Sequence, residues 1–222
     1  MRKYAIIVAG GKGLRMGNDI PKQFLELKGK PILMHSIERF YKYDTTISII
    51  VVLPQSQIEY WRELCSKHHF TINHTVVEGG EERFFSVRNG LDSISEINSV
   101  VAIHDGVRPL VSHETIARCF ETAIIEGNAV PCVDVVDSVR IQKNEGSEVV
   151  DRNELRLIQT PQTFQTKFLK EAYRLKWNKS FTDDASVVEA TGCKIILVEG
   201  NRENIKVTSP IDMKIAEAIL NV

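Results

Sequence analysis

The stretch that most constrains the fold lies near the N-terminus and reads KYAIIVAGGKGLRMG at residues 3–17. Its first part, Lys3–Ala9, is apolar and rich in isoleucine and valine, and it ends at glycines, as a buried β-strand does. Glycines after such a strand let backbone N–H groups approach an anion closely. The stretch therefore predicts a phosphate-binding loop directly after the first strand.

Strand and helix patterns alternate along the rest of the chain. Five further short runs are rich in valine and isoleucine and bounded by turn-forming residues: 47–53, 73–77, 100–104, 129–133 and 194–198. Most lack regular polar alternation, which indicates strands buried on both faces of a largely parallel sheet. Helical patterns lie over 33–41 after Pro31, between Ser112 and Gly127, and after Ser209. The alternation predicts one three-layer α/β/α domain over residues 1–222, with a mostly parallel, Rossmann-like sheet.

One segment breaks this rhythm between Val135 and Thr160. Two short β-prone runs, Val139–Ile141 and Glu148–Val150, flank the turn residues Asn144-Glu145-Gly146, which is a hairpin signal. A hairpin inserted into an α/β domain often projects from it. We therefore expect a β-arm at about residues 136–158 that needs another surface to bury it.

Composition excludes several classes of protein. The 222 residues carry 28 Lys plus Arg against 29 Asp plus Glu, a net charge of −1, which argues against a basic nucleic-acid platform. The four cysteines form no CxxC pair, so neither a disulfide scaffold nor a zinc ribbon is indicated. The longest apolar run, Ile47–Leu53, is far too short to span a membrane. We expect a cytoplasmic protein without nucleic-acid or membrane partners.

The glycine-rich loop fits neither of two familiar phosphate-binding motifs. A dinucleotide fingerprint fails at Met16, where glycine or alanine is required, and a Walker loop fails at Gly13, where serine or threonine is required. The loop instead carries Arg15 and Lys22, a local excess of cations in a near-neutral chain. Such a loop can hold a triphosphate and stabilise charge on a transferred phosphoryl group. From spacing alone, a solvated surface loop is the alternative.

The loop and the segment Pro21–Leu25 (PKQFL) together resemble the signature of nucleotidylyltransferases with the glycosyltransferase-A-like fold. Within that group they are similar to the cytidylyltransferases that act on sugar-alcohol phosphates. Further motifs of the family follow in its order: 79–83 with 86–87 and 90–91, 104–109, 137–138, 151–152 with 159–162, 182–186, and 200 with 204–208. The resemblance covers nearly the whole chain.

The resemblance implies a reaction between CTP and 2-C-methyl-D-erythritol 4-phosphate that gives CDP-methylerythritol and pyrophosphate, in non-mevalonate isoprenoid biosynthesis. Ribitol 5-phosphate is the alternative substrate, and the pair Gly10-Gly11 favours it. Arg83–Val87 and Arg152–Leu155 look more like the methylerythritol-phosphate enzymes, so we expect that substrate. A non-catalytic nucleotide-binding regulator is a weaker alternative. Such relatives typically lose the loop cations, whereas this chain has both Arg15 and Lys22.

The resemblance also assigns roles to particular residues. The residues expected to act in catalysis are Arg15, Lys22, Arg152 and Lys206. Those expected to bind CTP are Ala9, Gly10, Gly11, Gly13, Gly80, Glu81 and Ser86. Those expected to bind the second substrate are Asp105, Arg108, Ser138, Thr160 and Thr182. Mg²⁺ is the implied cofactor, held by Asp105 or else by the substrate phosphates alone. The family further implies a homodimer with swapped arms, in which Ser138 and Arg152 reach the neighbouring subunit's site.

Overall fold

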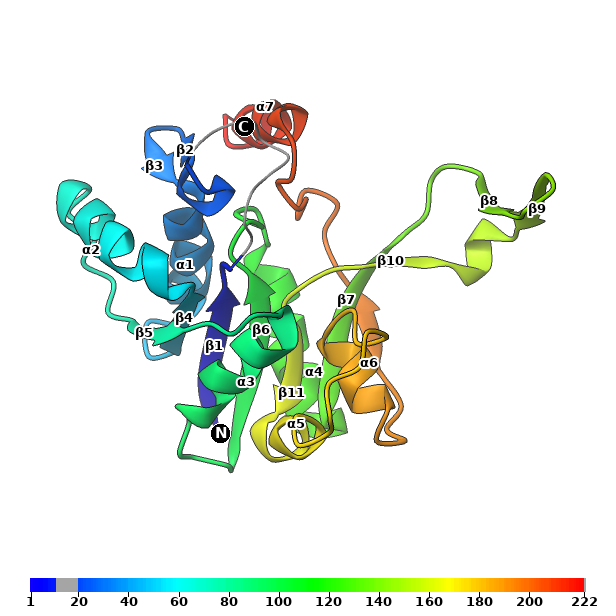
Figure 1. The fold of residues 1–222 in the computed structure, drawn as a ribbon, viewed down its shortest axis with the longest axis horizontal. Coiled ribbons are helices and arrows are strands. Elements are labelled where there is room, and N and C mark those ends of the chain that lie inside the picture. Colours follow the sequence, from blue (N-terminus) through cyan, green and yellow to red (C-terminus); the bar gives the residue numbers. More distant parts are fainter. Residues whose placement is uncertain (11–19, 222) are drawn as a thin grey trace.

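The computed structural model describes residues 1–10 and 20–221. Its main sheet follows the spatial order β10-β7-β11-β6-β1-β4-β5, with β12 beside β7. The strands are β1 (Arg2–Val8), β4 (Ser48–Leu53), β5 (Thr75–Glu78), β6 (Ser99–Asp105), β7 (Asn128–Asp134), β10 (Arg156–Ile158), β11 (Gln162–Gln165) and β12 (Leu197–Glu199). Only β10 and β11 run against the others, so the prediction of a mostly parallel sheet is confirmed (Figure 1). These two strands were not predicted from the sequence.

Helices cover both faces of this sheet. One face carries α1 (Ile32–Tyr43), α2 (Ile58–Lys67) and α4 (His113–Glu126). The other carries α3 (Arg83–Asp92), α5 (Thr166–Ala172) and α6 (Asp184–Glu189). Along β1, Ala5 and Ile7 pack toward the first group and Tyr4 and Ile6 toward the second. Because successive side chains of a strand point to opposite faces, this alternation produces the predicted three layers.

A smaller element group lies at one end of the domain. The two-stranded sheet of β2 (Glu26–Leu27) and β3 (Lys30–Pro31) packs with α7 (Pro210–Ile219) over a separate apolar cluster. Helix α7 begins as predicted, with Ser209 in a capping box and Pro210 in the first turn. Helix α7 thus packs at this end of the domain beside β2, which follows the glycine-rich loop in the sequence.

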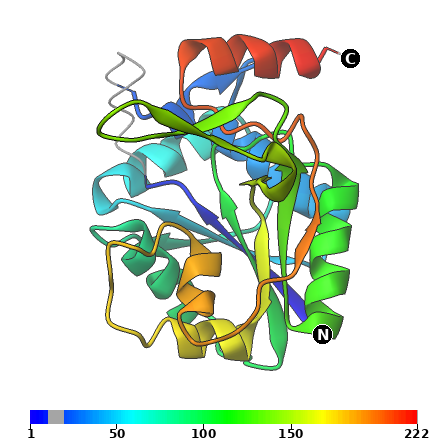
Figure 2. The ribbon, with the colours of Figure 1, turned by 90° about the vertical axis from the view of Figure 1, so that its right-hand side faces the viewer.

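The predicted hairpin is present and projects from the body. Strands β8 (Val139–Gln142) and β9 (Ser147–Val150) pair in antiparallel register, and Gly146 takes the positive φ of 77° that the turn requires. The one-turn helix η4 (Arg152–Glu154) follows. Figure 1 shows the hairpin well to the right of the sheet, and in Figure 2 it points toward the viewer. β7 leads into this arm and β10 returns from it.

The strand order also fixes where a ligand can bind. From β1 the chain proceeds to β4 and β5 on one side, and it then crosses back to place β6 on the other side of β1. Such a switch point opens a crevice at the carboxyl ends of the two neighbouring strands.

Within residues 1–10 and 20–221, no helix is both long and apolar enough to cross a membrane.

Candidate functional site

A cavity of about 240 Å³ lies at this switch point, where β1 and β6 end. Its described lining consists of Val8, Ala9, Gly10, Lys22, Gln23, Gly80, Glu81, Glu82, Arg83, Ser86, Asp105, Val107 and Lys206. Eight of these are among the site residues that the sequence predicts: Ala9, Gly10, Lys22, Gly80, Glu81, Ser86, Asp105 and Lys206. The fold therefore brings together residues that belong to separate motifs along the sequence.

The turn Gly79-Gly80 forms one wall of the cavity. The N–H of Gly80 donates to Oγ of the buried Ser86 at 3.1 Å, which ties the turn to α3. A Cβ atom on Gly80 would lie 2.3 Å from Cβ of Phe85, so no other residue fits there without a shift of the backbone. A Cβ on Gly10 would lie 3.9 Å from Oγ of Ser86, an ordinary contact. Of Gly10 and Gly80, only Gly80 is sterically required.

Gln23 joins the segment after the glycine-rich loop to the strand before it. Its side chain is fully buried, and Nε2 donates to the carbonyl oxygen of Ala9 at 2.8 Å and to Oε1 of Gln57 at 2.6 Å. The next residue, Phe24, stacks against Trp61 with 6.1 Å between ring centroids. These contacts hold η2 (Lys22–Phe24) against the end of β1 and so place Lys22 on the cavity.

Asp105, the last residue of β6, is surrounded by cations. Lys206 Nζ lies 3.0 Å and Arg108 Nε 3.4 Å from Oδ2, and Arg83 Nε lies 3.9 Å from Oδ1. Burial alone would raise the pKa of this carboxyl, but the charges of Arg83, Lys206 and Arg108 outweigh it and hold the pKa well below its usual range. Asp105 is therefore ionised at neutral pH; it holds Lys206 and Arg108 through one oxygen and lies 3.9 Å from Arg83.

A buried hydrogen-bond chain fixes Asp105 from behind. Its N–H donates to Oγ1 of Thr160 at 3.1 Å, and this hydroxyl is 3.1 Å from Nδ1 of His104. His104 Nε2 lies 3.0 Å from the carbonyl oxygen of Arg108 and must donate to it, so Nδ1 accepts from Thr160. Burial lowers the pKa of His104 to about 4, which keeps the ring neutral. The Thr160 hydroxyl is thus engaged within the protein, and its predicted contact with substrate stays a prediction.

Asn204 couples the segment that carries Lys206 to the same network. This fully buried side chain donates through Nδ2 to the carbonyl oxygen of Thr160 at 2.8 Å. Arg108 in turn donates through Nη1 to the carbonyl oxygen of Asn204 at 2.7 Å. Asn204 belongs to the motif at residues 204–208, but the sequence predicts no role for it, because a hydrogen bond to a backbone atom 44 residues away leaves no pattern in sequence.

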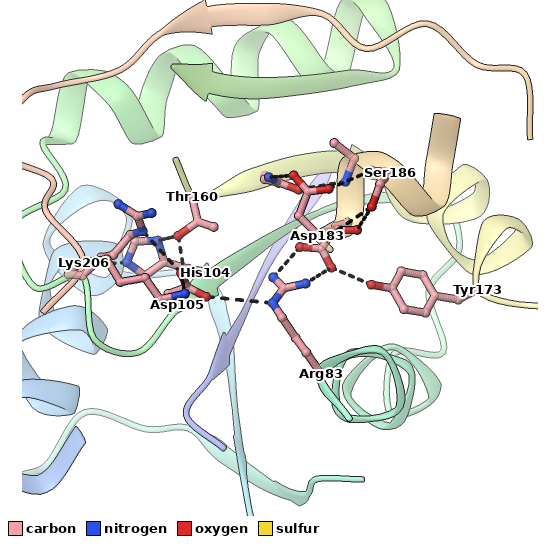
Figure 3. Close-up of polar contacts among 12 residues, drawn as sticks. Arg83, His104, Asp105, Thr160, Tyr173, Asp183, Ser186 and Lys206 are labelled. Carbon is pink, nitrogen blue, oxygen red and sulfur yellow. Dashed lines mark hydrogen bonds and ion pairs between the residues drawn. The ribbon is translucent and has the colours of Figure 1, made fainter. Parts of the chain in front are cut away.

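A second ion pair lies on the other side of Arg83, as Figure 3 shows. Arg83 donates to both carboxylate oxygens of Asp184, Nη1 to Oδ1 at 2.9 Å and Nη2 to Oδ2 at 2.6 Å. Tyr173 Oη donates to Oδ1 of Asp184 at 2.6 Å. Sequence reasoning gave roles to none of these three residues. Arg83 and Asp184 occur in quoted motifs, but their separation of 101 residues follows no recognisable spacing.

Some predicted residues lie away from the cavity or outside the described part of the chain. Ser138 and Arg152 are exposed on the arm, where the Arg152 guanidinium donates to the carbonyl oxygen of Val136. Thr182 is exposed in the loop before α6. None of the three is among the described residues that line the cavity. Three further predicted residues fall outside the described ranges: Gly11, Gly13 and Arg15.

The described residues do not fit a metal held by the protein itself. Within residues 1–10 and 20–221 there is no group of three or more His, Cys, Asp or Glu side chains that could hold a metal ion. Asp105, the expected ligand, already faces Lys206 and Arg108 through one oxygen and Arg83 through the other. A cation bound to this carboxylate would have to compete with those charges.

Comparisons with known proteins point to one family. Residues 4–222 match the family model of 2-C-methyl-D-erythritol 4-phosphate cytidylyltransferase. The chain is 54% identical to a protein of that name from Phocaeicola vulgatus, over 99% of this chain and 100% of the relative. It is 49% identical to one from Porphyromonas gingivalis, over 99% of this chain and 98% of the relative.

Solved structures agree with this result. The crystal structure of 2-C-methyl-D-erythritol 4-phosphate cytidylyltransferase from Thermus thermophilus matches with a TM-score of 0.81 and 32% identity, over 100% of both chains. A second crystal structure, of 4-diphosphocytidyl-2C-methyl-D-erythritol synthase from Anaerococcus prevotii, matches with a TM-score of 0.84 and 26% identity. That match covers 100% of this chain and 96% of the other. The fold and the sequence thus lead to the same family.

Proposed function

Since the chain belongs to the 2-C-methyl-D-erythritol 4-phosphate cytidylyltransferase family, we propose that the cavity between the ends of β1 and β6 is its active site. The protein is a nucleotidyltransferase of isoprenoid biosynthesis that joins a cytidylyl group to 2-C-methyl-D-erythritol 4-phosphate. The family match over residues 4–222 is the observation that carries this conclusion. Neither the ribitol 5-phosphate reading nor the non-catalytic one receives support from the relatives.

The reaction needs no protein nucleophile. A phosphate oxygen of the second substrate attacks the α-phosphorus of CTP in line, the new P–O bond forms, and the bond to the β-phosphate breaks to release pyrophosphate. Both reactants are anions and repel each other. The protein's contribution is therefore to align them and to neutralise charge at the α-phosphorus.

We assign the two substrates to opposite sides of the cavity. The cytidine would lie against Ala9, Gly10, Gly80 and Ser86, where small residues and backbone groups leave room for a ring. Lys22 would face the triphosphate. The family resemblance assigns the same role to Arg15, which lies outside the described residues. The phosphate of the second substrate would lie near Lys206 and Arg108, whose charges Asp105 orients. The lysine ammonium suits a point contact and the arginine fork a bidentate one.

We propose that the phosphates of CTP supply the ligands of the divalent cation. Asp105 instead pairs with the protein cations around it. The three cations around Asp105 support this assignment over direct coordination by its carboxylate. When bound, Mg²⁺ would neutralise part of the triphosphate charge. The cytoplasmic location expected from the sequence stays a prediction.

We further propose a homodimer in which each arm completes the partner's site. The arm exposes several large apolar side chains that water would otherwise surround: Val136, Ile141, Val149, Leu157 and Ile158. Exposed apolar groups concentrated on one projecting element are typical of an interaction surface. A partner that buries them would also receive Ser138 and Arg152.

The function is tested by pyrophosphate release from CTP and Mg²⁺ with either 2-C-methyl-D-erythritol 4-phosphate or ribitol 5-phosphate. We expect turnover with the first substrate and little with the second. The Lys22→Ala variant should keep its circular dichroism spectrum and lose about 10²-fold or more in kcat, the usual cost of one charge-stabilising group. Preference for ribitol 5-phosphate would overturn the substrate, and normal turnover by Lys22→Ala would overturn the role of that lysine.

A further inference from the structure

The proposed reaction assigns no role to the buried carboxylate of Asp184. Asp184 is fully buried on α6 and lies behind Arg83, and it is absent from the described residues that line the cavity. A buried charge is unfavourable unless it is paired and fully hydrogen-bonded. Asp184 meets this condition through both arms of the Arg83 guanidinium and the hydroxyl of Tyr173. The molecule thus maintains a buried anion outside the described lining of the cavity.

Arg83 links this anion to the active site. Its two terminal nitrogens are both directed at Asp184, and only Nε faces Asp105, at 3.9 Å from Oδ1. The arginine side chain is 29% exposed and lines the cavity. In Figure 3 dashed lines join the Arg83 guanidinium to Asp105 on one side and, on the other, to the carboxylate that Tyr173 also contacts, which is that of Asp184. The orientation of Arg83 is therefore set by Asp184.

The distances between cations and carboxylates show which groups form pairs. Lys206 approaches Asp105 to 3.0 Å, much closer than the 3.9 Å of Arg83. An arginine without its own counter-ion would satisfy its charge on the nearest carboxylate, which is Asp105. It would then compete with Lys206 and Arg108 for the same oxygens. Asp184 prevents that competition, because it neutralises Arg83 first.

We propose that Asp184 is a positioning residue for cytidylyl transfer, which acts through Arg83 to keep Asp105 available to Lys206 and Arg108. The inference rests on the proposed assignment of Lys206 and Arg108 to the second substrate. It implies that loss of Asp184 weakens the handling of 2-C-methyl-D-erythritol 4-phosphate rather than that of CTP. Tyr173 supports the same arrangement because it fixes one oxygen of Asp184.

The main test is Asp184→Asn in the full chain, assayed by pyrophosphate release. Asparagine keeps the size and one acceptor but removes the counter-charge of Arg83. We expect the KM for 2-C-methyl-D-erythritol 4-phosphate to rise at least about fivefold and kcat to fall about tenfold, with the KM for CTP within about twofold of wild type. Unchanged constants in a folded Asp184→Asn protein would overturn the proposal.

A double-mutant comparison separates action through Arg83 from any other effect. Arg83→Met removes the group through which Asp184 is proposed to act. Adding Asp184→Asn to Arg83→Met should then reduce kcat/KM for the second substrate less than about twofold further. If the two losses multiply instead, Asp184 acts independently of Arg83 and the proposal is wrong.

Two further variants test whether the changes in KM arise from reduced folding stability alone. Ser186→Ala breaks the capping box of α6 without touching Arg83, so it should lower thermal stability and leave both KM values unchanged. Tyr173→Phe keeps Asp184 and removes one hydrogen bond, so it should shift the KM for the second substrate in the same direction by a smaller factor. Tyr173→Phe carries the test if Asp184→Asn does not fold, and a wild-type KM in it would count against the proposal. A wild-type protein without turnover would instead refute the proposed function.

Discussion

At the scale of single residues, the electrostatics of the site centre on Asp105. Its carboxylate is nearly buried, yet the side chain of Lys206 beside it is 45% exposed and can reach a ligand in the cavity. An anion that holds a partly exposed cation in place restricts the long lysine side chain before substrate arrives. Such preorganisation lowers the entropy lost when the substrate phosphate binds.

The two glycines beside Ser86 give a matched pair of substitutions. Gly10→Ala adds a methyl group at an ordinary contact distance of 3.9 Å from Oγ of Ser86, so it should leave the melting temperature within error of wild type. Gly80→Ala places a methyl 2.3 Å from Cβ of Phe85 and must displace the turn, so it should lower the melting temperature and raise the KM for CTP about tenfold or more. Thermal unfolding of both variants and steady-state kinetics of Gly80→Ala check this. Equal melting temperatures of the pair would show that Gly80 is not sterically required.

The buried His104 predicts a pH dependence of folding stability. Its pKa is lowered from 6.5 to about 4, so between these pH values the unfolded chain binds a proton that the folded chain does not. Stability is therefore lost as the pH falls from 6.5 toward 4, and His104 should account for on the order of 2 kcal/mol between pH 7 and pH 5. Urea unfolding of wild type and His104→Gln at both pH values measures the difference. An equal loss of stability in both proteins would rule out His104 as its source.

At the scale of elements, strand ends and the arm have different tasks. β1 and β6 end beside each other and deliver Ala9 and Asp105 to the cavity, because parallel strands place their carboxyl ends at one edge of the sheet. The hairpin β8–β9 contributes no described residue to that cavity in its own chain. Its exposed apolar side chains support the proposal that the arm contacts a second chain.

The arm can be tested with two equally exposed apolar residues. Val149 on β9 is 74% exposed and Ile125 on α4 is 77% exposed in a single chain. If the arm forms the dimer, Val149→Asp places a charge in the interface and should shift the protein from dimer to monomer, whereas Ile125→Asp should leave the dimer intact. Light scattering coupled to size-exclusion chromatography gives both masses. Dissociation by Ile125→Asp alone would assign the interface to α4 instead of the arm.

At the scale of the whole molecule, the proposed site made by two chains depends on the separation of Arg152 from Lys206. Lys206 lines the cavity of the body, and Arg152 lies in η4, directly after β9. The hairpin β8–β9 projects from the body (Figure 1). If both residues act on the same substrate, the arm that supplies Arg152 comes from the neighbour. Activity would then depend on assembly as well as on folding.

Subunit mixing tests this dependence. A heterodimer of one Arg152→Ala chain and one Lys206→Ala chain contains one site with both residues intact and one site that lacks both. It should regain about half of the wild-type activity, while each homodimer stays nearly inactive. Heterodimers isolated with two different affinity tags provide the measurement. Verified heterodimers without recovered activity would mean that each chain uses its own Arg152.

The layered α/β fold, the hairpin and the family could all be predicted from the sequence. The reason is local: strand periodicity, capping residues such as Ser112 and Ser209, and turn residues such as Gly146 act within a few positions along the chain. The expected strands were found within three residues of their predicted ends. The antiparallel strands β10 and β11 were missed, because β10 is exposed and both are only three or four residues long, too short for a clear apolar period.

Tertiary structure alone decided how the charges are shared. The sequence names Asp105, Arg108 and Lys206, but it does not reveal that one carboxylate orients both cations, or that Thr160 and His104 support it from behind. Nor does it reveal that Asp184 neutralises Arg83 across a separation of 101 residues. Ion pairs and side-chain hydrogen bonds of this kind depend on distances in space, and only the packing of α3, α5 and α6 against the sheet brings these groups within reach of one another.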